Sequence, residues 1–216
     1  MQRIRIYYSK TQALRYTGNL DVHKIWERTL RRARLPLAYS QGFHPQPKIN
    51  QACPLPLGIL SRAEIVDIWL EPELPLEQVT KQLLKSIPPG FEIGHLEAID
   101  LHEPALQTRV AASRYQVTII TLPGENRVSL KELSEKVNAI LSSANLPRHW
   151  REKTYDLRPY IQELEIISPD EKGQPVLLMQ LSARQGATGR PEEVLSGMGF
   201  DPSSTRIERV GLVFLS

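Results

Sequence analysis

The first residues of the chain alternate strictly between polar and apolar side chains. Residues 3–8 read Arg-Ile-Arg-Ile-Tyr-Tyr, and a period of two is typical of a strand with one buried face. Ile4, Ile6 and Tyr8 are expected to face a core. The two arginines and Tyr7 would then line the opposite face.

Two stretches carry apolar residues three and four positions apart, which is typical of amphipathic helices. The first spans 19–35, with Asn19 as the expected N-cap, and it must end before Pro36. The second spans 76–87 and is stopped by Pro-Pro-Gly at 88–90.

Three further apolar runs in the first half predict strands at 49–57, 64–70 and 91–101. The first of these runs contains prolines, so it is expected at a sheet edge. The resulting order, β-α-β-β-α-β, is typical of ferredoxin-like folds.

The second half repeats this plan, with a capping box at Ser129 and Glu132 that predicts the start of a helix. Its predicted strands are 115–120, 149–153, 160–167, 176–183 and 207–214, and its predicted helices are 129–141 and 191–199. We therefore predict an α+β protein of two tandem ferredoxin-like (βαββαβ) domains with antiparallel sheets, 1–105 and 106–216. The boundary is expected in the polar stretch 100–112.

Composition limits the location and the chemistry of the chain. No run approaches the roughly 20 apolar residues that a membrane span needs, and the first residues lack the apolar core of a signal peptide. The single cysteine, Cys53, favours a reducing cytoplasm. One cysteine cannot hold an iron–sulfur cluster that needs three or four thiolates, so we expect no cofactor.

Basic charge is concentrated at one end of the chain. Residues 1–50 carry ten Lys or Arg against two acids, a net of +8, whereas 51–105 carry three against nine, a net of −6. The remaining residues carry fourteen against thirteen. A basic surface of this kind favours a polyanionic partner such as RNA.

The stretch 36–48 is the strongest candidate for a recognition loop. Its three prolines exclude a long helix or a central strand, and it combines aromatic, hydroxyl, amide, imidazole and ammonium groups. A connector whose aromatic residues fill the core is the alternative. The candidate binding residues of the first half are Arg3, Arg5, Lys10, Arg15, Arg28, Arg31, Arg32, Tyr39, Ser40, Gln41, Phe43, His44 and Lys48.

Two constrained loops of the second half, residues 156–159 and 184–191, also carry charge. Glycines beside a helix start could present N–H groups to an anion, although a salt bridge from Asp156 that merely holds the loops is the alternative. The candidates here are Asp156, Arg158, Arg184, Arg190 and Arg209, and Arg206 could extend the same patch.

Catalysis could use general acid–base groups of the first half of the chain. His44 or His23 together with Lys48 could cleave RNA without a metal. Ser40 and His44 lie close in sequence as a possible nucleophilic pair, but no third orienting group is evident. The five histidines lack zinc-like spacing, so no metal site is expected.

Several short motifs are landmarks of one known family. They are Tyr8-Ser9-Lys10, Leu14-Arg15-Tyr16, Leu20-Asp21, Arg31-Arg32-Ala33, the run from Leu35 to Pro45 that contains Ser-Gln-Gly-Phe-His-Pro, Pro47-Lys48-Ile49, Pro54-Leu55-Pro56-Leu57-Gly58, Glu64, Asp156-Leu157-Arg158-Pro159, Arg190-Pro191-Glu192-Glu193 and Ile207-Glu208-Arg209. With these motifs the chain resembles the radical SAM-linked protein family, an uncharacterised domain fused to, or encoded beside, a radical SAM protein.

The resemblance implies a radical SAM partner and, through a usual gene association with a ribonuclease of the E/G type, an RNA-related setting. It supplies no activity and no catalytic residues. The chain departs from the family where Gly18-Asn19 stands in place of Ser-His, so a role for that histidine does not carry over.

Three functions follow as hypotheses. The first is a cytoplasmic, non-catalytic accessory of a radical SAM enzyme that binds RNA, such as tRNA or rRNA. The second is a metal-independent RNA endonuclease of the type that processes CRISPR RNA. The third is a module that docks to proteins only.

Overall fold

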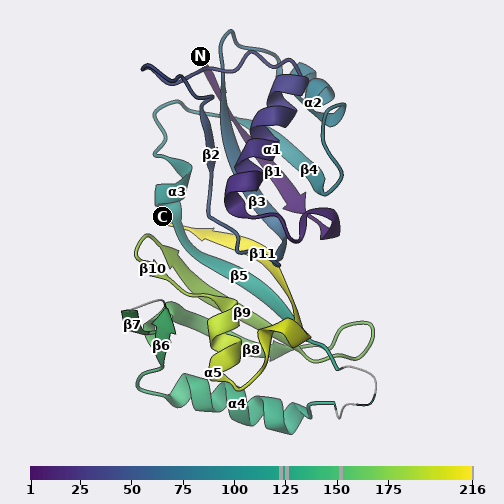
Figure 1. Ribbon diagram of the computed structural model, residues 1–216, viewed down its shortest axis with the longest axis vertical. Coiled ribbons are helices and arrows are strands. Elements are labelled where there is room, and N and C mark those ends of the chain that lie inside the picture. The colour runs from purple at the N-terminus through teal and green to yellow at the C-terminus, as the bar shows by residue number, and fades with distance from the viewer. Residues whose placement is uncertain (122–123, 125–126, 151–152, 216) are drawn as a thin grey trace. The chain divides into compact units, whose positions relative to one another are not determined.

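A computed structural model describes residues 1–121, 124, 127–150 and 153–215 of the chain (Figure 1). These residues form eleven strands and five helices. Nine strands belong to one large mixed sheet, and β6 (Pro147–Trp150) and β7 (Lys153–Asp156) form a separate hairpin. The chain divides into two compact units, Met1–Val110 with Leu215, and Ala111–Phe214.

The predicted fold class is wrong. It expected two tandem small ferredoxin-like domains, each with its own sheet, whereas nine of the strands formed by the described residues belong to one sheet. Alternation along the sequence identifies strands but not the size of the sheet that they join. Every edge strand offers unpaired main-chain N–H and C=O groups whatever its side chains are, so the sequence pattern carries little information about this pairing.

The first unit has the strand order β2-β3-β1-β4, and these neighbours run antiparallel. Its elements are β1 (Gln2–Lys10), α1 (Asn19–Arg32), β2 (Ile49–Gln51), β3 (Leu60–Leu70), α2 (Leu76–Leu84), β4 (Phe91–Ile99) and the short α3 (Leu106–Arg109).

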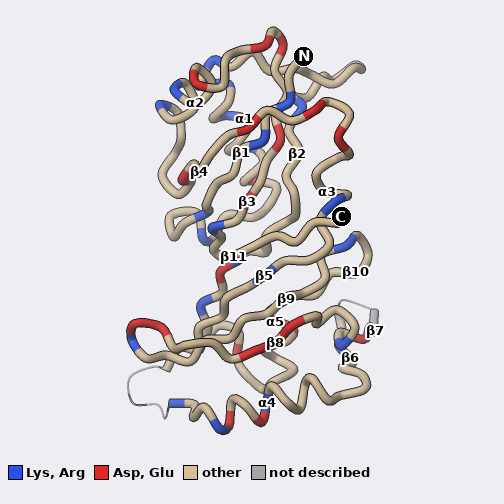
Figure 2. The backbone as a smooth tube through the Cα atoms, turned by 180° about the vertical axis from the view of Figure 1, so that it is seen from behind, with Lys and Arg blue, Asp and Glu red and all other residues tan. Residues whose placement is uncertain are grey.

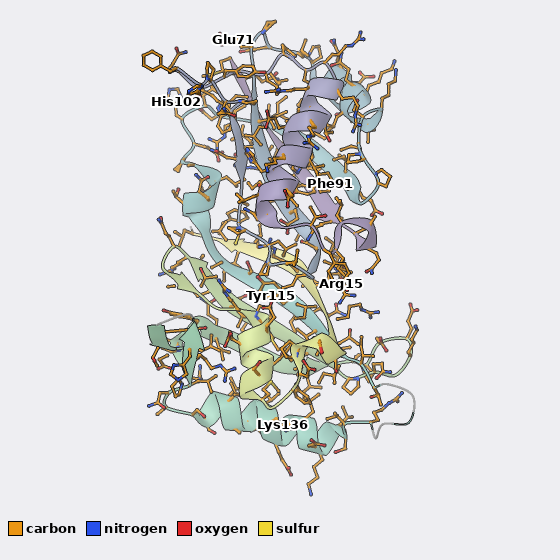
Figure 3. The ribbon with its side chains drawn as sticks, in the orientation of Figure 1. Arg15, Glu71, Phe91, His102, Tyr115 and Lys136 are labelled. Carbon is orange, nitrogen blue, oxygen red and sulfur yellow. The ribbon has the colours of Figure 1, made fainter. Side chains whose placement is uncertain are left out.

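Helices α1 and α2 cover one face of this part of the sheet (Figure 1). Ile4, Ile6 and Tyr8 face them, as the alternation predicts. Trp26 of α1 is fully buried and stacks on Phe91, which Figure 3 labels, with ring centroids 5.0 Å apart. Arg3 and Arg5 therefore lie on the face that the helices leave uncovered.

Two element boundaries differ from the sequence expectation. Gly18, not Asn19, is the N-cap of α1, and no side chain caps this end. Strand β2 ends at Gln51 rather than at 57, because Pro54 and Pro56 lack the N–H donors that would extend the pairing.

The second unit has the strand order β10-β9-β5-β11, and β8 also pairs with β9. Its elements are β5 (Val110–Ile119), α4 (Leu130–Ser142), β6, β7, β8 (Ile161–Ile167), β9 (Val176–Arg184), β10 (Ala187–Thr188), α5 (Pro191–Gly197) and β11 (Thr205–Phe214).

The predicted helix starts of this unit are confirmed. Ser129 Oγ accepts a hydrogen bond from the Glu132 amide at 3.1 Å, and Pro191 is the first residue of α5. The strand predicted over 149–153 includes Arg151 and Glu152, which lie outside the described residues.

Within the described part of the chain, no helix combines the length and the apolar character needed to cross a membrane.

Burial along α1 gives a matched pair of substitutions. Leu30→Ala should lower the free energy of unfolding by about 2–5 kcal/mol, because Leu30 is fully buried. Leu20→Ala on the same helix should change it by less than about 0.5 kcal/mol, since Leu20 is 77% exposed. Urea denaturation followed by tryptophan fluorescence measures both. Equal losses would contradict this orientation of α1.

Candidate functional site

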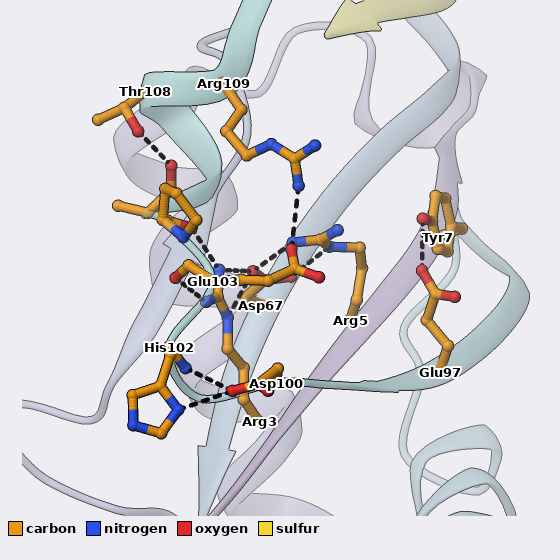
Figure 4. Close-up of polar contacts among 12 residues, drawn as sticks. Arg3, Arg5, Tyr7, Asp67, Glu97, Asp100, His102, Glu103, Thr108 and Arg109 are labelled. Atoms are coloured by element: carbon orange, nitrogen blue, oxygen red, sulfur yellow. Dashed lines mark hydrogen bonds and ion pairs between the residues drawn. The ribbon is translucent and has the colours of Figure 1, made fainter. Parts of the chain in front are cut away.

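Two arginines of β1 share one buried carboxylate on the sheet face that α1 and α2 leave uncovered (Figure 4). Arg3 donates to Asp67 Oδ2 from Nε at 3.0 Å and from Nη2 at 2.7 Å. Arg5 donates from Nε to Oδ1 at 2.8 Å and from Nη2 to Oδ2 at 3.0 Å. The register sets Arg5 opposite Asp67 and Arg3 opposite Trp69. Asp67 is fully buried, and two hydrogen-bonded cations are what a buried carboxylate requires.

The segment after β4 covers this ion network. Arg3 donates to the carbonyl oxygens of Glu103 at 2.6 Å and Pro104 at 3.0 Å, and the Glu103 carboxylate pairs with Arg109 at 3.0 Å. Arg3 is 2% exposed and Arg5 is 7% exposed. The expectation that these two arginines contact phosphate is therefore corrected, because Asp67 draws both guanidinium groups into the interior.

The side chains of Lys10 and Arg15 also bind main-chain carbonyl oxygens of the first unit. Lys10 is buried, and its ammonium group donates to the carbonyl oxygens of Arg15 at 3.3 Å and Ile59 at 3.2 Å. Arg15 donates to the Gly58 carbonyl at 3.0 Å, and its guanidinium carbon lies 5.3 Å from the centroid of the Tyr16 ring. The expectation that Lys10 contacts phosphate is also corrected, because its side chain is buried.

Tyr7 packs within the first unit. Its ring stacks on His95 with centroids 4.0 Å apart, and its hydroxyl donates to Glu97 at 2.6 Å. Burial, together with the Glu97 carboxylate, raises the pKa of Tyr7 to about 12. One ring face is thus already occupied by an intramolecular stack.

An exposed basic cluster remains at the C-terminal end of α1 and the neighbouring end of α2. Figure 2 shows Lys and Arg gathered around these helices. The ends lie together because Arg32 donates to the Ser86 carbonyl at 2.6 Å, and Arg31 pairs with Glu27 at 2.7 Å. The members of this basic cluster, all exposed, are Arg28, Arg31, Arg32, Arg34, Lys81 and Lys85.

The stretch 36–48 is an ordered hairpin-like loop. The Ser40 amide donates to the Gln46 carbonyl at 2.8 Å, and the Lys48 amide donates to the Ala38 carbonyl at 2.8 Å. Ala38 also donates to the Trp69 carbonyl at 2.8 Å, which ties the loop to β3. These bonds give the loop a fixed neck below its tip.

The tip of this loop points into solvent. Phe43 is fully exposed, at 102% of its reference area, and Tyr39 is 41% exposed. Gln41 and His44 are exposed as well, and Gly42 has the positive φ of 132° that the turn requires. The alternative in which the aromatic residues of the loop fill the core is therefore wrong for these two rings.

A shallow pocket lies at the neck of the loop, and sequence reasoning missed most of it. Its volume is about 420 Å³, and it is lined by Ser40, Gln46, Pro47, Lys48, Ile49, Asn50 and Trp69. Only Ser40 and Lys48 were predicted site residues. The register that brings Asn50 opposite Asp67 is a tertiary feature with no local signal in the sequence.

The residues considered for catalysis are not joined. His44 lies at the exposed tip, His23 is half-buried on α1, and Lys48 lies at the neck. Among the residues that the structure describes, no hydrogen bond or ion pair links these three side chains. No group of three or more His, Cys, Asp or Glu in the same described part of the chain could hold a metal ion.

The charged loops of the second unit mainly brace the backbone. Asp156 accepts from the amides of Leu146 at 2.7 Å and Arg158 at 3.0 Å. Arg158 donates to the carbonyl oxygens of Ile161 at 3.1 Å and Leu141 at 2.9 Å. These groups hold the loops through main-chain contacts rather than through the Asp–Arg salt bridge considered from the sequence.

The other basic candidates of this unit differ in how exposed their side chains are. Arg184 is exposed at the end of β9, Arg190 is half-buried before α5, and Arg209 is fully buried. Arg206 pairs with Asp170 at 3.4 Å. The buried Arg209 does not contribute to an exposed basic patch.

The described residues form an α+β protein with a basic helix end and an exposed loop at 36–48. The chain belongs to a bacterial family described as "Uncharacterized protein conserved in bacteria (DUF2344)", whose model matches residues 3–191. No curated protein matches the chain.

Two solved structures show distant likeness to the chain. One is a putative dyp-type peroxidase protein from Shewanella oneidensis, 12% identical, covering 99% of this chain and 91% of that one at a TM-score of 0.24. The other is a heavy metal efflux pump, 9% identical, covering 96% of this chain and 28% of that one at a TM-score of 0.24. Likeness at this level does not define a shared fold.

The buried carboxylate gives a second matched pair of substitutions. Asp67→Asn should destabilise the protein by about 3–5 kcal/mol, because it leaves two buried guanidinium groups without their counter-charge. Glu103→Gln should cost about 1 kcal/mol or less, since its carboxylate is one-third exposed. Chemical denaturation of both variants measures the difference. A smaller loss for Asp67→Asn than for Glu103→Gln would contradict the central place of Asp67.

Proposed function

We propose that the protein binds RNA through a surface of its first unit that consists of the basic cluster and the tip of the loop 36–48. The observation that carries this proposal is the full exposure of Phe43 on a hydrogen-bonded loop that begins four residues after the last residue of α1. Binding residues lie disproportionately on loops that a rigid scaffold positions, and Phe43 is presented on a loop of this kind.

The charge of the basic cluster supports a polyanionic ligand. Its six cations come from the ends of two helices, where Arg31 alone has a carboxylate partner among the described residues. The helix dipole also favours cations near a helix C-terminus, so these residues stabilise the helices as well. Six clustered cations can nevertheless neutralise several phosphates at once.

The chemistry of the loop tip favours RNA with unpaired bases. Sequence-tolerant contacts to such bases come from aromatic rings on which the bases stack. Tyr39, Phe43 and His44 supply rings of this kind, and Gln41 adds an amide that can hydrogen-bond to a base edge.

The resemblance to the radical SAM-linked protein family extends the proposal to a partner. In this proposal the chain acts in the cytoplasm as a non-catalytic accessory, and it presents tRNA or rRNA to a radical SAM enzyme that carries the iron–sulfur cluster. Cys53 is the only cysteine of the chain, which agrees with the cluster being held by the partner.

Charge reversal tests the basic cluster. Arg28→Glu with Arg31→Glu should weaken RNA binding at least about tenfold and lower the slope of log affinity against log salt by about 1–2, because about 0.7 is lost per phosphate contact on a single strand. Arg32 is left unchanged because it holds Ser86. Filter binding to total cellular RNA at several salt concentrations measures both quantities.

The matched control reverses two exposed lysines of the second unit, Lys131 and Lys172, with the same change in net charge. It should bind RNA as the wild type does. Equal loss in both double variants would reduce the effect to net charge and contradict the proposed surface.

The loop tip is tested by Phe43→Ala. Losing one stacked base should weaken RNA binding by about 1–3 kcal/mol, whereas Leu57→Ala, which removes another exposed apolar side chain of the first unit, should have no effect. Denaturing gels of the RNA incubated with the protein report whether it stays intact in EDTA. Cleavage that His44→Ala abolishes would support the endonuclease alternative instead. Unchanged RNA affinity with loss of a co-purifying radical SAM protein would support the docking alternative.

A further inference from the structure

One wall of the pocket at the neck of the loop is the ring of Trp69, which packs against Arg3. Trp69 is half-buried and lines the pocket. The guanidinium carbon of Arg3 lies 5.1 Å from the centroid of its ring, and Arg3 is fixed in turn by Asp67. The ring is therefore held by a buried cation within the same unit, and its remaining surface is available to a ligand.

Three polar side chains in the pocket are uncommitted. Lys48 Nζ contacts only the sulfur of Met1, at 3.9 Å, and no carboxylate pairs with it in the part of the chain that the structure describes. Within the same residues, the side-chain amides of Gln46 and Asn50 have no hydrogen-bond partner. An ammonium group and two amides thus converge beside an indole ring.

This combination of groups fits one nucleotide. An aromatic side chain stacks on a base, amides hydrogen-bond to base edges, and a lysine pairs with a phosphate. The volume of about 420 Å³ falls within the range of small-molecule sites. An apolar ligand would leave the amides and the ammonium group without partners, which is costly.

We propose that this pocket binds a single unstacked nucleotide, with the base against Trp69, its edge at Asn50 and Gln46, and its phosphate at Lys48. The inference rests on the proposed RNA binding and names the unit of RNA that is recognised. Ser40 and Gln46 belong both to the pocket and to the hydrogen-bonded neck of the loop. A strand that contacts the loop tip could therefore place its next base in the pocket.

Tryptophan fluorescence tests the proposal directly, because stacking on Trp69 should quench its emission. AMP, GMP, CMP, UMP and a short single-stranded oligoribonucleotide are titrated into the full chain, with inorganic phosphate as the ion control. We expect saturable quenching by at least one mononucleotide and by the oligonucleotide, none by phosphate, and loss of the signal in Trp69→Phe.

A matched pair on β2 locates the amide contact. Asn50→Leu should weaken nucleotide binding about tenfold or more, the discrimination that a good amide–base pair provides. Gln51→Leu makes the same kind of change on the adjacent residue, which does not line this pocket, and should leave affinity unchanged. Thermal unfolding of both variants controls for folding.

The proposal is overturned if no nucleotide quenches Trp69 emission at millimolar concentration, or if Asn50→Leu and Gln51→Leu bind alike. Its failure is distinguishable from failure of the proposed function. If Asn50→Leu binds nucleotides and RNA as the wild type does while Arg28→Glu with Arg31→Glu weakens RNA binding, only the pocket is wrong. If neither variant weakens RNA binding, the proposed RNA surface is wrong as well.

Discussion

The pairing of Asp67 with Arg3 and Arg5 is the interaction on which the first unit depends. A carboxylate on the inner part of a sheet is tolerated only with charged partners and saturated hydrogen bonds, and the antiparallel register of β1 and β3 supplies both. The same arginine, Arg3, supports the ring of Trp69 and binds the segment after β4. One buried acid thereby organises a strand pair, a covering segment and a pocket wall.

This pairing also decides where the positive charge of the chain is displayed. Asp67 holds Arg3 and Arg5 inside the unit, and Lys10 is buried separately against two carbonyl oxygens. The excess of charge counted along the sequence therefore overstates what a ligand meets. Most of the exposed cations of the first unit lie at the C-terminal ends of α1 and α2, with Lys24 and Arg62 as the exceptions. A count along the sequence gives the net charge of a segment. Buried partners such as Asp67 then determine which of its cations are exposed.

Local signals predicted elements well, and long-range pairing poorly. The period of two placed Ile4 and Ile6 in the core, and Ser129 marked the start of α4, because both are decided within a few residues. The size of the sheet and the burial of Arg3 were missed, since Asp67 is 64 residues away. Trp69 and Asn50 escaped notice for the same reason: each looks like an ordinary strand residue until its cross-strand neighbours are known.

The hydrogen-bonded neck of the loop 36–48 has a consequence for the kinetics of recognition. A disordered segment must fold as it binds, and the free energy of that ordering is subtracted from the affinity. Main-chain bonds from Ser40 to Gln46 and from Lys48 to Ala38 fix this hairpin before any ligand arrives. Association with such a loop is limited by collision and orientation rather than by conformational search.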